Sequence, residues 1–196
     1  MKVGGIVLAA GRSTRMGHPK ALLEIEGRTF LERAVDTLAG GGCEPVLVVL
    51  PAGESRGRLG ELARAVGAEA VENPLAEAEQ IDSLRCGLAA LSEAVEAAVV
   101  QPVDHPLADA RTVRALVDGF AASGAPIVRP VYRDRPGHPV LFARRVWDEL
   151  ADADLERGAR DVVHRYADAI YDVRLDDRGV AVDIDTVGDY EREVGS

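Results

Sequence analysis

Residues 8–20 read L-A-A-G-R-S-T-R-M-G-H-P-K and overlap the end of an apolar run that begins at Val3. The apolar run extends to Ala9 and predicts a buried strand. A glycine-containing turn after such a strand can present backbone N–H groups to a phosphate. The spacing fits neither a dinucleotide-binding G-x-G-x-x-G nor a Walker A loop, because five residues separate Gly11 from Gly17 and Lys20 follows three positions later. The stretch therefore predicts a strand followed by a distinct anion-binding loop.

Basic residues gather in this part of an acidic chain. Residues 1–20 contain Lys2, Arg12, Arg15 and Lys20 and no carboxylate, whereas the whole chain has a formal net charge of −10. Solvated arginines in an ordinary β–α turn would explain one such residue. Three cations beside two glycines favour a polyphosphate site instead, in which Arg12, Arg15 and Lys20 neutralise the phosphates.

The composition excludes several classes of protein. A chain of 196 residues, 47% of them hydrophobic, fits one globular domain, predicted to span residues 1–196. The net charge argues against nucleic acid and anionic membranes as partners. Cys43 and Cys86 are isolated and lack the spacing of zinc ligands. No apolar run approaches the roughly 20 residues that cross a bilayer, and the N-terminus does not resemble a signal peptide, so we expect a cytoplasmic protein.

Strand and helix patterns alternate along the chain. Short apolar runs predict strands, and apolar residues three and four positions apart predict helices. The predicted strands are residues 3–9, 45–50, 68–71, 97–103, 127–131, 139–142, 170–173 and 180–184. The predicted helices are residues 29–39, 56–66, 80–91, 110–121, 144–151 and 159–167, with a last one after Thr186. The alternation predicts an α/β fold, a three-layer sandwich with a mostly parallel central sheet, in which ligands bind beyond the carboxyl ends of the strands.

Two acidic segments lie at the ends of predicted strands: one contains Asp104, and the other is D-I-D-T at residues 183–186. Asp104 comes after the apolar run A-A-V-V-Q-P-V and precedes His105. Its carboxylate could cap the following turn, but its position between prolines at a strand end favours a magnesium ligand. His105 could orient the loop or transfer a proton. In D-I-D-T, strand alternation would place Asp183 and Asp185 on one face, and either Asp185 or Thr186 is expected to cap the last helix.

One long motif is specific enough to indicate a family. It reads L-A-A-G-R-x-x-R-M-G-x-P-K and continues as A-L-L-E-I-E-G-R-T-F-L-E-R-A. Shorter matches follow in order: N-P (73–74), S-L-R-C-G-L (83–88), P-V-D-H-P-L (102–107), G-H-P-V-L-F (137–142), G-A-R (158–160) and D-I-D-T (183–186). With these motifs the chain resembles the MobA-like nucleotidyltransferases, in particular the molybdenum cofactor cytidylyltransferases. The resemblance covers nearly the whole chain and implies a Rossmann-like nucleotidyltransferase fold.

The resemblance implies a Mg²⁺-dependent nucleotidyltransferase. The acceptor, a phosphorylated small molecule such as molybdopterin cofactor, would attack the α-phosphorus of a nucleoside triphosphate and release pyrophosphate. CMP is favoured as the transferred group, because Ala10 stands where guanylyltransferase relatives commonly have glycine and its methyl group narrows the space for a purine. The residues implied are Arg12, Arg15, Lys20 and Asp104 for catalysis, Asp104 and Asp183 for the metal, Leu8, Ala9, Ala10, Gly11, Asn73, Gln80 and Ser83 for the nucleotide, and Arg133, Arg135, His138 and Arg160 for the acceptor.

The chain also departs from the family's pattern. The stretch before S-L-R reads Glu79-Gln80-Ile81-Asp82-Ser83, where cytidylyltransferases usually have small residues near the ribose and base. Val103 stands where glycine is common. A guanylyltransferase of the same family, a nicotinamide-dependent oxidoreductase on the same fold and a nucleotide-holding chaperone therefore remain alternatives. The two metal carboxylates and Lys20 argue against the chaperone, because a pure binding protein needs no such pair.

Overall fold

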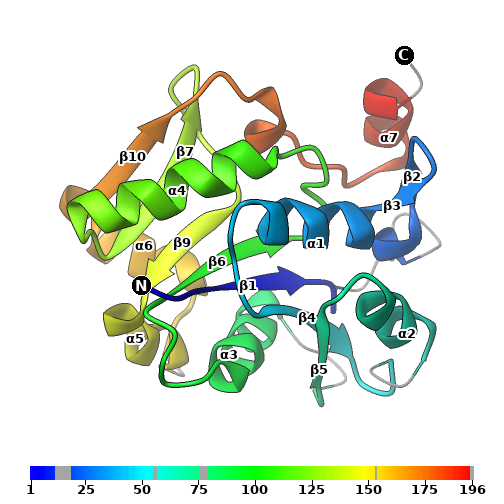
Figure 1. Ribbon diagram of the computed structural model, residues 1–196, viewed down its shortest axis with the longest axis horizontal. Helices are drawn as coiled ribbons and strands as arrows, with labels where there is room; N and C mark the ends of the chain where they lie inside the picture. The colour runs from blue at the N-terminus through cyan, green and yellow to red at the C-terminus, as the bar shows by residue number, and fades with distance from the viewer. Residues whose placement is uncertain (12–18, 55–56, 76–78, 153, 195–196) are drawn as a thin grey trace.

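A central sheet organises the molecule. The computed structural model describes residues 1–11, 19–54, 57–75, 79–152 and 154–194. Within them, the strands of this sheet are β1 (Val3–Leu8), β4 (Val46–Pro51), β5 (Glu69–Asn73), β6 (Ala97–Pro102), β7 (Ile127–Tyr132), β8 (Arg135–Pro136), β9 (Val140–Ala143) and β10 (Ile170–Arg174). Their order is β10-β7-β9-β6-β1-β4-β5 (Figure 1). β8 pairs with β7 beside that path.

Most neighbouring strands are parallel. β1 pairs in parallel with β4 and β6, so that Leu8 lies beside Val49 on one side and Pro102 on the other. β5 continues the parallel arrangement beyond β4, and β10 is parallel to β7. β9 is antiparallel to both β6 and β7. The predicted mostly parallel sheet is confirmed, and β5, β4, β1 and β6 all end at one edge.

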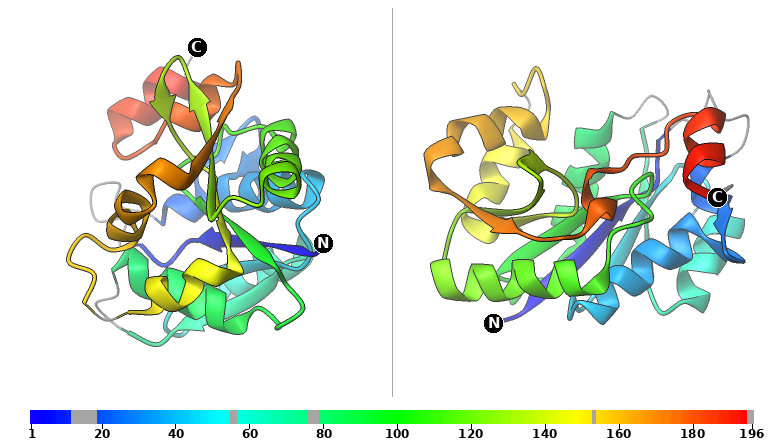
Figure 2. Two further views of the ribbon diagram at one scale, coloured as in Figure 1. Left: turned by 90° about the vertical axis from the view of Figure 1, so that its left-hand side faces the viewer. Right: turned by 90° about the horizontal axis from the view of Figure 1, so that it is seen from above.

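Helices cover both faces of the sheet (Figure 2). One face carries α1 (Phe30–Gly40), α2 (Arg58–Ala65) and α4 (Ala110–Ser123). The opposite face carries α3 (Gln80–Ala90), α5 (Trp147–Ala151) and α6 (Ala159–Arg165). The predicted three-layer sandwich is therefore confirmed. Among the described residues, no helix combines the length and the apolar composition needed to cross a membrane.

Shorter helical segments complete the chain. The last helix, α7 (Val187–Val194), lies beside α1, where the rings of Phe30 and Tyr190 have centroids 6.2 Å apart. The 3₁₀ segments are η1 (Lys20–Leu22), η2 (Arg144–Val146), η3 (Ala167–Ala169) and η4 (Arg178–Ala181). The helix predicted over residues 144–151 is thus divided between η2 and α5.

Side-chain caps fix the ends of the helices next to the site. At the start of α1, the Thr29 N–H donates to Glu32 Oε2 at 2.6 Å, and the Glu32 N–H donates to Thr29 Oγ1 at 3.2 Å. Asp109 caps the start of α4, where its carboxylate accepts from the Arg111 N–H at 2.7 Å. Gly124 caps the end of α4 and adopts the left-handed conformation with φ of 59°. These caps satisfy backbone groups that the helices leave unpaired.

The predicted strand over residues 180–184 is wrong. The chain instead turns in η4 and then runs on outside the sheet. Asp177 starts this turn by accepting a hydrogen bond from the Gly179 N–H at 2.9 Å. A Cβ at Gly179 would lie 2.0 Å from the carbonyl oxygen of Leu107, so the segment packs closely on the loop after β6. This long-range contact decides the local conformation, and it cannot be predicted from the hydrophobic periodicity of the segment.

Three strands of only two residues each, which belong to two short hairpins, were not among the predicted strands. The first joins β2 (Glu24–Ile25) to β3 (Arg28–Thr29). The second joins β7 to β8 through Arg133 and Asp134, which have φ of 45° and 64°. Two successive residues with positive φ make the tight turn typical of two-residue hairpins. The second turn reverses the chain inside the predicted acceptor segment.

Candidate active site

An ammonium group lies between two carboxylates at the carboxyl edge of the sheet. Asp104 follows β6, and Lys20 begins η1 after the loop that follows β1. Lys20 Nζ donates to Asp104 Oδ2 at 3.4 Å and makes a short hydrogen bond to Asp185 Oδ1. The side chains of Lys20 and Asp104 are only 14% and 27% exposed. The fold therefore gathers three partly shielded charges from segments far apart in the sequence.

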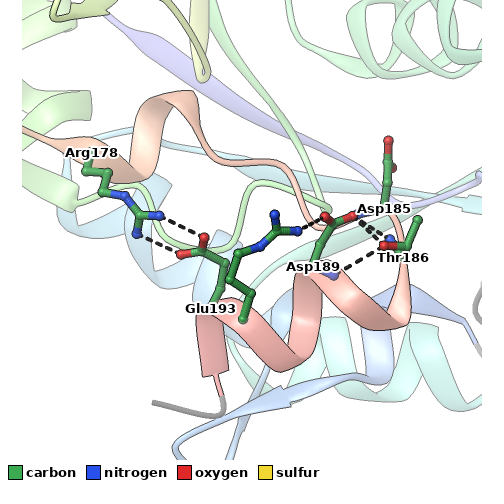
Figure 3. A network of polar contacts seen from close by, with 6 residues as sticks. Arg178, Asp185, Thr186, Asp189 and Glu193 are labelled. Atoms are coloured by element: carbon green, nitrogen blue, oxygen red, sulfur yellow. Dashed lines mark hydrogen bonds and ion pairs between the residues drawn. The ribbon is translucent and has the colours of Figure 1, made fainter.

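The D-I-D-T segment is anchored by α7 (Figure 3). The Thr186 N–H donates to Asp189 Oδ2 at 2.9 Å, and the Asp189 N–H donates to Thr186 Oγ1 at 3.2 Å. Near the other end of α7, Glu193 accepts two hydrogen bonds of 2.7 Å from Arg178 of η4. Of the two residues predicted to cap the last helix, Asp185 and Thr186, it is therefore Thr186 that caps it. The Asp185 carboxylate is left to meet Lys20.

Alternate burial survives in this segment although the strand does not form. Ile184 is fully buried, Asp183 is exposed and Asp185 is half-buried. The Ile184 N–H donates to the carbonyl of Asp104 at 2.9 Å. This bond holds the acidic segment beside the loop after β6. Burial lowers the pKa of His105, and the charges of both aspartates partly oppose that shift.

Two histidine rings pack against each other next to Asp104. The ring centroids of His105 and His138 are 4.6 Å apart, and each Nδ1 atom is buried without a hydrogen-bond partner in the described residues. Burial lowers the pKa of His138 to about 3, with smaller contributions from His105 and Arg160. Burial also lowers the pKa of His105, although the charge of Asp104 opposes this effect. Both rings are neutral at pH 7, so His138 offers a substrate a hydrogen bond rather than a positive charge.

A cavity of about 830 Å³, the main cavity, opens at the ends of β1 and β6. The predicted nucleotide contacts Leu8 and Gln80 line it, and so do the predicted acceptor contacts His138 and Arg160. Its apolar wall includes Val100, Val140, Phe142, Val163 and Ile170. Arg129 and Arg157 also line it, and each is paired with a carboxylate at 2.7 Å, Arg129 with Asp172 and Arg157 with Asp161. One cavity therefore combines groups expected to meet two different substrates.

The other predicted nucleotide contacts differ in exposure. Ala9 is buried, Ala10 is half-buried and Gly11 is exposed at the start of the loop. Asn73 and Ser83 are buried and bonded to each other, with Asn73 Nδ2 donating to Ser83 Oγ at 3.1 Å. Since Asn73 also accepts from the Leu75 N–H at 3.0 Å, this pair links the end of β5 to α3.

The unusual Glu79–Asp82 stretch forms the cap of α3. The Glu79 N–H donates to Asp82 Oδ2 at 3.0 Å, and the Glu79 side chain accepts from the Asp82 backbone in return. Asp82 also accepts a hydrogen bond from Arg85 at 3.2 Å. The residues that depart from the family's pattern therefore have a structural role at the helix start. Gln80, between them, lines the main cavity.

A second cavity of about 550 Å³, the arginine cavity, lies beside the β7–β8 hairpin. Arg133 and Arg135 line this cavity together with Asp183, and Arg178 and Arg192 contribute further guanidinium groups. His138, two residues after β8, lines the main cavity instead. As a result, the four predicted acceptor contacts divide between two cavities, two in each.

Some site residues lie beyond reach of the structure, and others were missed by the sequence analysis. Arg12 and Arg15, predicted to be catalytic, lie outside the described residues. Gln101 was not predicted, although it is fully buried at the end of β6 and its Nε2 donates to the His105 carbonyl at 3.0 Å. The amide stands out in the apolar run of β6, and that contrast could have revealed it. Nothing in the sequence indicates that Lys20 pairs with Asp185.

Comparison with known proteins identifies the family. The profile of the MobA-like NTP transferase domain matches residues 5–170, most of the chain. This protein belongs to the MobA-like NTP transferases. Rv0371c from Mycobacterium tuberculosis H37Rv, a solved structure, is 31% identical to this MobA-like chain with a TM-score of 0.84, and 100% of each chain is covered. A structure of Rv0371C in complex with manganese has 30% identity, a TM-score of 0.80 and the same coverage.

Curated relatives of this MobA-like protein match over shorter stretches. Nicotine blue oxidoreductase of Paenarthrobacter nicotinovorans is 51% identical over 51 residues, which are 26% of this chain and 25% of that protein. A probable molybdenum cofactor guanylyltransferase of Opitutus terrae is 47% identical over 47 residues, 24% of this chain and 23% of that protein. The matches thus span about a quarter of each relative, and the names of the two relatives describe different reactions.

The carboxylates of Asp104 and of the D-I-D-T segment suit a divalent cation whose other ligands are water and substrate phosphates. Asp104 Oδ1 is buried and accepts no hydrogen bond from the described residues, so this carboxylate does not cap a turn there. No group of three or more His, Cys, Asp or Glu side chains among the described residues is arranged to hold a metal by itself. Mg²⁺ typically takes one or two carboxylates together with water and substrate phosphates. The unpartnered oxygen suits such a partial site.

Proposed function

We propose that this protein transfers a nucleoside monophosphate, with CMP favoured, from a nucleoside triphosphate to a phosphorylated small molecule such as molybdopterin cofactor. The observation that carries the proposal is the Lys20–Asp104–Asp185 cluster, which the fold assembles near a cavity lined by nucleotide-side and acceptor-side residues. Membership of the MobA-like family supports the class of reaction.

In the proposed reaction an oxygen of the acceptor's phosphate forms a bond to the α-phosphorus. The bond from the α-phosphorus to the oxygen bridging to the β-phosphorus breaks, and pyrophosphate leaves with that electron pair. Because the acceptor supplies the attacking oxygen, the protein needs no serine or cysteine nucleophile. The chain's contribution is electrostatic: Lys20, with Arg12 and Arg15, neutralises charge on the phosphates.

The metal is proposed to be Mg²⁺, bound by Asp104 and one carboxylate of D-I-D-T. When bound there, it would supply a Lewis acid that neutralises triphosphate charge. Asp183 is the ligand expected from the family resemblance, whereas Asp185 faces Asp104 across Lys20. Asp183→Asn and Asp185→Asn variants separate the two assignments. Loss of the ligand should raise the Mg²⁺ concentration needed for half-maximal rate, and loss of the other carboxylate should not.

The base is proposed to lie along the backbone from Leu8 to Gly11, with Gln80 across the main cavity. The Ala10 methyl group narrows the space beside this backbone, which favours cytosine over a purine. The capping of α3 by Glu79 and Asp82 supports this arrangement, because it keeps two carboxylates engaged near the expected ribose.

The acceptor is proposed to occupy the main cavity, against its apolar wall. Arg160 would hold the phosphate, and His138 would donate or accept a hydrogen bond as a neutral ring. Arg133 and Arg135 would reach the acceptor from the other side of the hairpin, through an anionic group at the arginine cavity. Arg160→Gln should therefore raise the acceptor KM without changing the nucleotide KM.

One observation favours a second candidate, a nicotinamide-dependent oxidoreductase: the identity with nicotine blue oxidoreductase over 51 residues. The two reactions are separated by incubating purified protein and Mg²⁺ with CTP, GTP, UTP or ATP and molybdopterin. Nucleotidyl transfer gives pyrophosphate that depends on the acceptor. Oxidation of NADPH by a reducible substrate, with no pyrophosphate from any triphosphate, would support the oxidoreductase instead.

A further inference from the structure

The ammonium group of Lys20 lies between the carboxylates of Asp104 and Asp185. Lys20 Nζ contacts one oxygen of Asp104 and one oxygen of Asp185, although these residues come from different segments. The lysine side chain is 14% exposed and the Asp185 side chain 44%, so the ammonium is the more shielded partner. A metal bound by Asp104 and Asp185, one of the two assignments above, would meet the same pair of carboxylates. Lysine and metal would then compete for one pair of negative groups.

The competition is electrostatically necessary rather than incidental. Two carboxylates held near each other repel unless a cation lies between them, and partial burial strengthens that repulsion. The hydrogen bond from the Ile184 N–H to the Asp104 carbonyl joins the two acidic segments through backbone atoms, in addition to the lysine contacts. In the nucleotide-free protein, the ammonium supplies the balancing charge.

The side chain of Lys20 can move its ammonium group from the carboxylates to another anion without a change in the backbone. Ala21, the next residue, is buried, so the backbone at this position is anchored while the side chain projects from it. A lysine side chain is a flexible four-carbon stem with a strongly hydrated charge at its end, and it can move its charge without moving its backbone. The loop that precedes it is the one predicted to meet the triphosphate.

We propose that Lys20 is an internal counter-ion that holds the metal carboxylates until a metal–nucleotide complex arrives, and that its displaced ammonium then moves onto the triphosphate. This inference rests on the proposed function. The metal enters with the nucleotide because the complex supplies both a replacement cation for the carboxylates and new anionic oxygens for the lysine. Metal alone supplies only the first, so it must displace the ammonium into water.

The proposal predicts weak binding of metal to the nucleotide-free protein. If more than nine-tenths of the molecules have the lysine on the carboxylates, the apparent metal affinity falls by about tenfold or more. Lys20→Met removes the competing charge and should therefore tighten binding of Mn²⁺ to the nucleotide-free protein by about tenfold or more. Electron paramagnetic resonance of free Mn²⁺ during a titration measures this affinity directly.

Matched variants separate this effect from a general change of charge. Arg28→Met also removes one cation near the loop, but Arg28 pairs with Asp36 at the surface, so Mn²⁺ affinity should stay at the wild-type value. Adding Asp185→Asn to Lys20→Met should abolish the gain. Unchanged or weaker Mn²⁺ binding by folded Lys20→Met would overturn the proposal, and so would an equal gain in Arg28→Met.

Lys20→Gln serves if Lys20→Met does not fold, because its amide can still donate to the carboxylates without carrying charge. The wild-type protein gives an independent measurement: a non-hydrolysable CTP analogue should tighten Mn²⁺ binding beyond the sum of separate binding to protein and analogue. Purely additive binding would contradict the exchange. Failure of the proposed function is distinct, since it would appear as absent pyrophosphate release while the Mn²⁺ gain in Lys20→Met persists.

Discussion

The half of the sheet formed by β5, β4, β1 and β6 repeats one parallel strand-and-helix unit, whereas the half formed by β9, β7 and β10 contains an antiparallel strand and a hairpin. The first half carries the loop before Lys20 and ends at Asp104. The second half is held in place by contacts between distant segments, such as the bond from the His138 N–H to the Val180 carbonyl at 2.9 Å. The half proposed to bind the nucleotide is therefore predictable from local sequence patterns, whereas the half proposed to bind the acceptor depends on long-range packing.

The largest expected effect lies where the two halves meet. Asp104→Asn keeps the shape of the side chain but removes its charge, so kcat should fall by about 10²–10³-fold while the protein stays folded. Steady-state pyrophosphate release and a far-UV circular dichroism spectrum measure the two outcomes. Asp118→Asn, at an exposed position on α4, is the control and should keep the wild-type rate. A normal rate in Asp104→Asn at ordinary Mg²⁺ would remove this residue from the mechanism.

The next effect concerns how the second half is held. Gly179→Ala places a methyl group 2.0 Å from the Leu107 carbonyl oxygen, so the free energy of unfolding should fall by about 1–3 kcal/mol in urea denaturation. Gly188→Ala, in the first turn of α7, has 3.8 Å to its nearest neighbouring atom and should be neutral or slightly stabilising. Equal stability of the two variants would show that the η4 contact does not hold this half together.

The buried His138 makes the stability of the second half sensitive to acid. Because the pKa of His138 is about 3 in the folded protein against 6.5 ordinarily, the unfolded chain binds more protons between these values. Stability is therefore unaffected above pH 6.5 and falls as the pH drops towards 3, by up to about 1.4 kcal/mol for each pH unit. His138→Gln should reduce this slope, measured by urea denaturation at pH 7 and pH 5.

His164 supplies the control for this pH dependence, because it is exposed on α6. His164→Gln should keep the wild-type slope. His105 is also buried with a lowered pKa, so His138→Gln should reduce the acid sensitivity without abolishing it. A slope identical to that of the wild type in His138→Gln would mean that this ring is not shielded as the structure places it.

The smallest expected effect tests the nucleotide side. Ala10→Gly removes the methyl group proposed to disfavour a purine, so the ratio of kcat/KM for CTP to that for GTP should fall by about tenfold, equivalent to about 1.4 kcal/mol. Competition between CTP and GTP at equal Mg²⁺ measures this ratio. A wild-type preference for GTP, or a ratio that Ala10→Gly leaves unchanged, contradicts the assignment of the base to Ala10.

The contrast between the halves also explains what sequence could predict. The apolar patterns predicted the three-layer sandwich, because the buried residues of a strand or a helix recur in the sequence with the period of that element. The same periodicity failed at residues 180–184, where close packing of Gly179 on Leu107 decides the backbone. It also could not show that Arg133 and Arg135 line one cavity while His138 lines the other.

Individual site residues follow the same division. Asp104 was predictable because it ends an apolar strand run, and the structure does place it at the carboxyl edge of the sheet. The partnership of Lys20 with Asp185 spans 165 positions and depends on the cap at Thr186, which releases the aspartate from the helix. Asn73 and Ser83 carry the right residue types for a nucleotide, yet their mutual hydrogen bond is visible only in three dimensions.

Transfer of the α-phosphate tests the central claim most directly. Purified protein is given Mg²⁺, molybdopterin and CTP labelled at the α-phosphorus, and the label in the acceptor is counted against the pyrophosphate released. Nucleotidyl transfer predicts one labelled phosphate in the acceptor for each pyrophosphate, with neither formed when the acceptor is omitted. Intact triphosphate and an unlabelled acceptor, with GTP, UTP and ATP giving the same result, would contradict the account.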